Sequence, residues 1–187
     1  MDAPVAVLWL WTLLFAALAV PCAYRLAQAV DQRRRVDETA ELLMCVGMLA
    51  MVSPLGWPVP LAGWRALFMV SAVGLAVAWW RSRRLTVDKG QCGHHAVMAV
   101  VMVYMLVAVP HAHRAGDPWL TMAGHGGSLA FWPLAALALA YCAVDIVRGA
   151  ARLLRAAPGH GLCGERSRVV SRLAGSAGMG AMIAVMV

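Results

Sequence analysis

The sequence predicts an all-α, polytopic membrane protein: a bundle of six transmembrane helices in one integral membrane domain over residues 1–187. Of these 187 residues, 62% are hydrophobic and only 13% are charged, far from the averages of soluble domains. The apolar residues form long blocks, a pattern that favours membrane spans over a buried core. The basic residues gather in short clusters between the blocks, as in loops beside a membrane.

The apolar blocks can be followed in order along the chain. The first ends at Arg25, the second is closed by Pro54, the third ends in WWRSRR and the fourth stops at Pro110. The fifth follows a long loop, and the sixth is the weakest because it is rich in small residues. Each block has close to the ~17–25 residues that a bilayer core requires. We expect spans at about 4–24, 38–57, 62–80, 94–110, 128–147 and 169–187.

The distribution of basic residues sets the expected orientation. Fourteen of the 16 Lys and Arg residues fall in the loops 25–37, 81–93 and 148–172, which leaves only Arg65 and Arg114 on the other side. Loops rich in Lys and Arg face the cytoplasm and its anionic lipids. We therefore expect a multi-pass plasma-membrane protein with both termini outside. The lipid bilayer is its main partner, and we expect no nucleic-acid binding despite a net charge of +7.

A methionine pattern recurs in alternate spans. The second span reads ELLMCVGMLAM from Glu41, and the fourth reads HAVMAVVMVYM from His95, so both follow [E/H]-x-x-M-x-x-x-M-x-x-M. The sixth has a degenerate copy: Arg172 is its head, Gly175 replaces the first methionine, and the methionines at 179 and 182 remain. All three spans are expected to run in the same direction, so the copies are parallel.

The spacing places each copy on one side of its helix. At 100° per residue the four positions fall within an arc of roughly 80° and rise roughly 15 Å. If the three faces converge, Glu41, His95 and Arg172 form a polar ring near the cytoplasmic side, and the thioethers form a cage above it. Glu41 and Arg172 could also simply pair.

Two interpretations of the methionine faces remain open. Methionine fills irregular gaps between helices, so the pattern can be a packing seam. Thioether and imidazole groups also suit Cu(I), so the pattern can be a column of metal ligands. Titratable residues inside a membrane are costly and usually functional, which strengthens the second interpretation. Near the end of a span, however, Glu41 and His95 could also extend toward the headgroups, which returns weight to packing. The candidate ligands are Glu41, Met44, Met48, Met51, His95, Met98, Met102 and Met105.

The His/Glu-headed methionine helices, the pair His94-His95 and the six-span hydropathy resemble an actinobacterial family of uncharacterised His/Met-rich integral membrane proteins, catalogued as a domain of unknown function. The resemblance implies a small plasma-membrane protein and no established activity. It also implies a fuller histidine–methionine set in the third copy, from which Arg172 and Gly175 depart.

Three further features of the sequence predict local structure or binding. The loop 110–127, PHAHRAGDPWLTMAGHGG, holds three histidines that can form a second metal site or a solvated loop. Asp145 is expected to pair with Arg148 or Arg152 near the end of its span. Small residues at four-residue spacing in the sixth span, such as Ser171 and Gly175, allow close approach of another helix.

The sequence contains no phosphate-binding loop, dinucleotide fingerprint, nucleophile elbow or zinc-protease motif, so we do not expect an enzyme. The first functional hypothesis is a membrane protein that binds or passes copper along the Glu/His/Met column. The alternative is a non-catalytic accessory or structural subunit of a larger membrane complex. In that case the methionine faces are packing seams, and the sixth helix docks a membrane partner or a second copy of the chain.

Overall fold

The structure is a computed structural model that describes residues 5–53, 60–83, 90–108, 131–155 and 164–186. Within these residues the chain forms six helices, as the sequence predicts. They are α1 (Val5–Gln28), α2 (Gln32–Val52), α3 (Leu61–Arg83), α4 (Gly90–Ala108), α5 (Trp132–Arg155) and α6 (Glu165–Met186).

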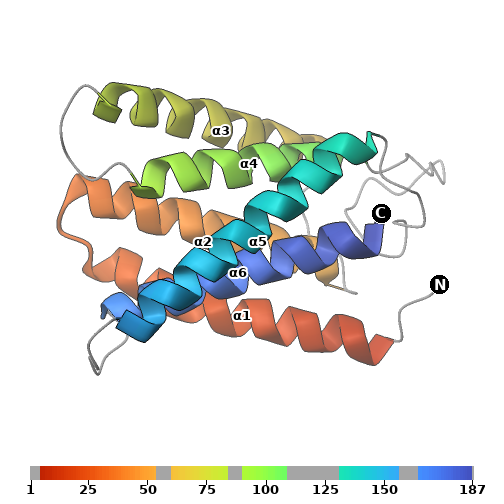
Figure 1. Cartoon of the computed structure of the whole chain (residues 1–187), viewed down its shortest axis with the longest axis horizontal. Coiled ribbons are helices and arrows are strands. Elements are labelled where there is room, and N and C mark those ends of the chain that lie inside the picture. The colour runs from red at the N-terminus through yellow and green to blue at the C-terminus, as the bar shows by residue number, and fades with distance from the viewer. Residues whose placement is uncertain (1–4, 54–59, 84–89, 109–130, 156–163, 187) are drawn as a thin grey trace.

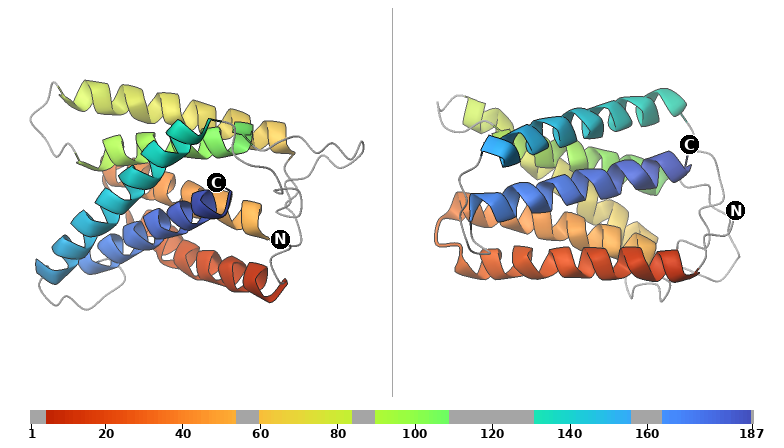
Figure 2. Two further views of the ribbon diagram at one scale, coloured as in Figure 1. Left: turned by 45° about the vertical axis from the view of Figure 1, so that its right-hand side comes forward. Right: turned by 60° about the horizontal axis from the view of Figure 1, so that its bottom comes forward.

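The helices pack as three antiparallel hairpins, α1–α2, α3–α4 and α5–α6, which make the most extensive helix contacts. The hairpins meet through α2, which contacts both α4 and α6, and α1 also contacts α6. The three helices that carry the methionine pattern run in the same direction (Figure 1). In both views of Figure 2, α1 begins and α6 ends at the same end of the bundle.

The outer helices α1, α3 and α5 bury only a narrow stripe each. In α3 the stripe is Trp64, Phe68, Ala72 and Leu75, at the three- and four-residue spacing of one helix face. Each outer helix is long and apolar enough to cross a membrane, and only 17–28% of the residues in those apolar segments are buried. Their exposed sides carry large apolar side chains, so these three helices have the surface of lipid-facing spans.

The inner helices α2, α4 and α6 contribute a broader buried surface that contains both methionine and polar residues. Helix α4 has a shorter apolar segment, Cys92–Val107, and α2 and α6 begin with several charged residues. All eight methionines of the three sequence copies belong to one buried core. They are Met44, Met48, Met51, Met98, Met102, Met105, Met179 and Met182.

Two phenylalanines from the outer helices pack into this core at glycines of the inner helices. A Cβ atom at Gly178 of α6 would lie 2.6 Å from Cζ of Phe15, which comes from α1. A Cβ atom at Gly47 of α2 would overlap Phe68 of α3 and lie 2.9 Å from Cε of Met102. The two glycines are therefore required for close approach between helices of different hairpins.

The helix bounds differ from the expected spans mainly at the end where α2, α4 and α6 begin. Helix α1 continues to Gln28, so Arg25 lies inside it and not in a loop. Helices α2, α4 and α6 each begin about one turn or more earlier than the apolar blocks do. Charged residues therefore continue these helices beyond the apolar segments, because a helix needs backbone hydrogen bonds and not apolar side chains.

Candidate functional site

A small cavity of about 30 Å³ lies between the inner helices. This volume exceeds the roughly 10–15 Å³ that a single water needs. The methionine-bearing faces of all three inner helices meet at this cavity, as do the three head residues. The lining residues are Glu41, Met44, Cys45, Met48, His94, His95, Met98, Ser171, Arg172, Gly175, Ser176 and Met179.

The methionines divide into two sets along the bundle axis. Met44, Met48, Met98 and Met179 line the cavity, so four thioethers from three helices face the same space. The other methionines, Met51, Met102, Met105 and Met182, lie farther along the helices and pack in the core. The predicted column therefore divides into a cavity-lining half and a packed half.

The glycine that replaces the first methionine of the third copy, Gly175, helps to create the cavity. Gly175 stands where the second and fourth spans have Met44 and Met98, and a Cβ atom placed on it would meet nothing within 4 Å. It is also one of the lining residues. The missing third methionine therefore leaves open space between the other two copies.

A second, larger cavity of about 210 Å³ lies at the end of the bundle where the inner helices begin. We call it the vestibule; its lining residues are Asp37, Glu38, Glu41, His95, Glu165, Arg168, Val169 and Arg172. Glu41, His95 and Arg172 line both the vestibule and the small cavity. The three head residues therefore lie between a polar entrance and a thioether-lined interior.

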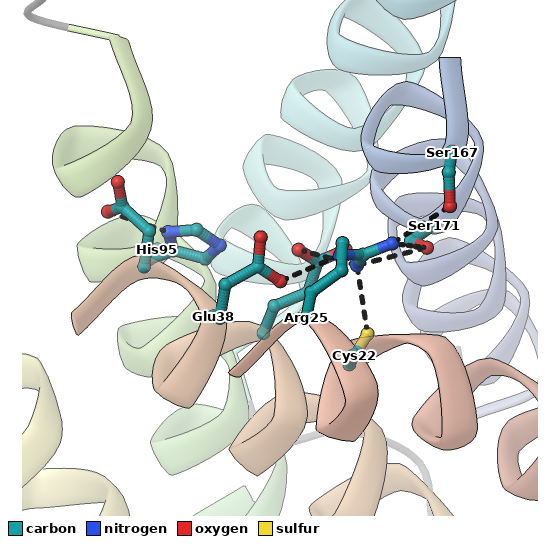
Figure 3. A network of polar contacts seen from close by, with 8 residues as sticks. Cys22, Arg25, Glu38, His95, Ser167 and Ser171 are labelled. Carbon is teal, nitrogen blue, oxygen red and sulfur yellow. Dashed lines mark hydrogen bonds and ion pairs between the residues drawn. The ribbon is translucent and has the colours of Figure 1, made fainter. Parts of the chain in front are cut away.

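Arg25 holds one side of this boundary together. Its guanidinium donates to Oε2 of Glu38 at 2.8 Å, and its Nη2 lies 3.4 Å from Oε2 of Glu41. It also donates to the hydroxyls of Ser167 and Ser171 at 3.0 and 3.3 Å (Figure 3). Because these partners come from α2 and α6, Arg25 joins three helices. The side chain is almost fully buried, which corrects the expectation of a cytoplasmic-loop residue.

Asp145 of α5 holds the opposite side. Arg172 donates two hydrogen bonds to its carboxylate, and the Ser176 hydroxyl donates to Oδ2 at 2.8 Å. The expected pairing with Arg148 or Arg152 is therefore wrong. The hairpin turn brings Arg172 of α6 against the buried face of α5, whereas Arg148 and Arg152 lie on the exposed side of that helix. The expected pairing of Glu41 with Arg172 is replaced by pairs with Arg25 and Asp145, respectively.

The charges in these two networks do not balance. Arg25 and Arg172 face the three carboxylates of Glu38, Glu41 and Asp145, and all five side chains are largely buried. Glu41 has the longest ion-pair contact, and its Oε1 is buried without a hydrogen-bond partner among the described residues. The Glu41 carboxyl group therefore has no guanidinium of its own, and a negative charge buried there would be costly.

The structure adds site residues that the sequence pattern does not select. His94, Cys45 and Ser176 also line the small cavity. His94 was visible as the neighbour of His95, but the pattern gave no sign of which of the two faces inward. The histidines of the loop 110–127 lie outside the described residues. Among the described residues, no group of three or more His, Cys, Asp and Glu side chains is placed to hold a metal ion.

Comparison with known proteins yields one family. The chain matches no curated protein and no solved structure. A family model described as a domain of unknown function, DUF5134, matches residues 33–186, which include nearly all of α2 and the whole of α3 to α6. That match covers every residue that lines the vestibule and the small cavity. The chain therefore belongs to the DUF5134 family.

Proposed function

We propose that this protein binds a single Cu(I) ion in the small cavity between α2, α4 and α6, in the plasma membrane, with Glu41 and His95 at the cavity entrance. The observation that carries this proposal is the convergence of four thioethers on one buried cavity beside two imidazoles. Thioether and imidazole are the ligands that Cu(I) accepts and that hard cations such as Mg²⁺ and Ca²⁺ do not prefer.

The carboxylates around the entrance support the entry of a cation. Glu41 lies between the vestibule and the small cavity, and its carboxylate has only a shared, longer contact with Arg25. A cation that passes Glu41 offsets part of the excess negative charge of the carboxylates around the entrance. Glu41 therefore acts as the electrostatic attraction at the cavity entrance.

Passage of the ion is the second part of the proposal. Met51, Met102 and Met105 extend the same helix faces beyond the cavity, toward the other end of the bundle. In this proposal all six helices span the bilayer, both termini lie outside, and the ion moves between the vestibule and the outer surface. We also predict that the family is actinobacterial and that its members are rich in histidine and methionine.

One observation favours the alternative of a structural or accessory subunit. Four of the eight methionines of the repeated pattern pack in the same core as Phe15 and Phe68 and line neither of the two cavities. In the small-residue series of α6, Gly178 packs against Phe15 and Ser171 bonds to Arg25, so these positions already serve contacts inside the bundle. A partner would then dock on other surfaces of the bundle.

The test is a Cu(I) titration of the purified full-length protein in detergent, under anaerobic reducing conditions, against a chromophoric Cu(I) competitor. We expect one Cu(I) per chain. The double variant Met48→Leu/Met98→Leu removes two thioethers at nearly constant volume, a change that cores usually tolerate. We expect it to weaken binding by roughly tenfold or more, since each tenfold loss is only about 1.4 kcal/mol.

Met182→Leu is the matched control, because Met182 is buried in the same core but does not line the cavity. It should bind Cu(I) like the wild type. Gly175→Leu should abolish binding without removing any ligand, because it fills the open space beside α6. If the wild type binds no Cu(I), or if the control loses affinity as much as the double variant does, the proposal is wrong.

Passage is tested separately in cells. Met51→Leu/Met105→Leu should leave Cu(I) binding in place and change copper tolerance, whereas His95→Ala/Met98→Leu should change both. Unchanged copper tolerance in both double variants would rule out passage. Co-purification of a stoichiometric membrane protein, together with unchanged copper handling, would favour the accessory subunit.

A further inference from the structure

His94 has a more restrained position than its neighbour. The residue is 6% exposed and lines the small cavity from α4. Its ring stacks on Tyr141 of α5, with centroids 5.9 Å apart and planes inclined by 22°. The ring atom Nδ1 lies 3.0 Å from the Tyr141 hydroxyl oxygen. One nitrogen of His94 is therefore engaged on the α5 side.

Asp145 lies close enough to influence which way this hydrogen bond runs. Its Oδ1 lies 3.6 Å from Nδ1 of His94, too far for a hydrogen bond but close enough for a strong electrostatic effect. A lone pair on Nδ1 would be repelled by that carboxylate, whereas an N–H is attracted to it. With the proton of neutral His94 on Nδ1, the ring donates to the Tyr141 oxygen and faces the carboxylate with an N–H, although Arg172 on the same carboxylate offsets part of that attraction. Arg172 and Ser176 fix Asp145 in place.

This arrangement has a known chemical use. Histidines that bind metals usually donate one ring N–H to a carboxylate or another acceptor, which fixes the tautomer and leaves the other nitrogen with its lone pair. We propose that His94 is the nitrogen ligand of the small cavity, through Nε2, and that Tyr141 and Asp145 are positioning residues that fix its tautomer. This inference rests on the proposed function, since it names a ligand of the same cavity.

His95 has a different environment. Its Nδ1 lies 4.0 Å from Oδ1 of Asp37, on the vestibule side, and the residue lines both cavities. The two adjacent histidines therefore have separate roles: His95 belongs to the entrance, and His94 belongs to the interior with the thioethers. The sequence pattern places His95 at the head of the methionine column, and the structure adds His94 beside it in the lining of the small cavity.

X-ray absorption of the Cu(I)-loaded, full-length protein distinguishes the two histidines. The wild type should show sulfur neighbours together with the scattering pattern of one imidazole. His94→Gln should lose the imidazole signal and bind Cu(I) at least about tenfold more weakly. His95→Gln should keep the imidazole signal. If the imidazole signal survives in His94→Gln and disappears in His95→Gln, the assignment is wrong.

The positioning role has its own measurement. Tyr141→Phe keeps the stacked ring and removes only the hydroxyl, so we expect the imidazole signal to remain while Cu(I) binding weakens by roughly 10-fold, as for other outer-sphere partners. In the metal-free protein, nitrogen NMR should show His94 protonated on Nδ1. A proton on Nε2 would overturn the positioning role, and so would Cu(I) affinity that is unchanged in Tyr141→Phe.

The outcomes separate this inference from the proposed function. If the wild type binds Cu(I) and His94→Gln binds it equally well, only the role of His94 is wrong. If the wild type binds no Cu(I), both the function and the ligand assignment fail. Asp145→Asn removes the charge at almost constant shape, and loss of the Nδ1–H tautomer there, with the hydroxyl of Tyr141 intact, would identify the carboxylate as the group that fixes it.

Discussion

The outer and inner helices of this bundle differ in which surfaces they expose and in the polarity of their side chains. The outer helices α1, α3 and α5 present apolar side chains over most of their surface and bury one stripe. The inner helices α2, α4 and α6 are less uniformly apolar and carry Glu41, His94, His95 and Arg172. Hydropathy alone shows that the outer set is long and apolar enough to cross a membrane. The inner set can carry polar groups because other helices surround it.

The division into outer and inner helices does not separate apolar from charged residues. Arg25 and Asp145 belong to outer helices, yet both side chains point inward and bond to inner helices. Each outer helix therefore has a lipid-facing side that follows hydropathy and a buried stripe that can carry charge. This division makes three predictions, given in order of expected effect.

The largest effect is expected at Arg25. Replacing it with alanine leaves the buried carboxylates of Glu38 and Glu41 without a guanidinium, and breaking a buried pair in this way costs about 3–5 kcal/mol. The free energy of unfolding, measured by SDS titration in mixed micelles, should fall by that amount. Arg152→Ala is the control, because Arg152 is exposed on α5 and should change stability little. Equal effects at the two positions would mean that Arg25 is not a structural part of the inner network.

The second effect concerns the lipid-facing side of α3. Val70 lies near the middle of the helix and is 71% exposed. A charged residue at the centre of a spanning helix costs about 2.5–3.5 kcal/mol of insertion free energy, whereas the same change on a water-facing surface usually has an effect within about 0.5 kcal/mol. Val70→Asp should therefore reduce the fraction of protein that resists alkaline extraction from membranes, and Val70→Leu should not. Normal insertion of Val70→Asp would place this side of α3 in water.

The smallest effect compares two glycines. Gly178→Ala places a methyl group 2.6 Å from Phe15, so we expect a loss of about 1–3 kcal/mol from overpacking. Gly74 of the outer helix α3 has open space around its Cβ position, and Gly74→Ala should stabilise the helix by up to about 1 kcal/mol. Midpoints of thermal unfolding in detergent should move in opposite directions. A midpoint of Gly178→Ala that stays unchanged or rises would contradict the close approach of α1 and α6.

Much of the architecture could be predicted from the sequence. Long apolar blocks gave the number of helices among the described residues, and the repeated spacing from Glu41 and His95 identified parallel faces that meet in the structure. Such patterns are readable because they depend only on helix periodicity and on the solvent that each surface needs. The six-span topology and the orientation of the termini stay predictions.

The sequence was not sufficient where the answer depends on a single rotation or on a partner far along the chain. His94 and His95 differ by one residue, which is 100° around the helix, and only the position of α5 decides which one meets Tyr141. Asp145 pairs with Arg172 because of the register between α5 and α6. In the sequence, Arg25 marks the end of an apolar block. In the structure, it is bonded to partners from α2 and α6.

By itself, then, the sequence determined which surfaces are apolar, which helices carry methionine and which residues head each copy. Local composition and periodicity contain this information. Only the tertiary structure decided that the third copy leaves a cavity at Gly175, that four of eight methionines line it, and that buried carboxylates outnumber guanidiniums around it. These properties depend on distances between side chains of different helices, and those distances are set by how the three hairpins pack against one another.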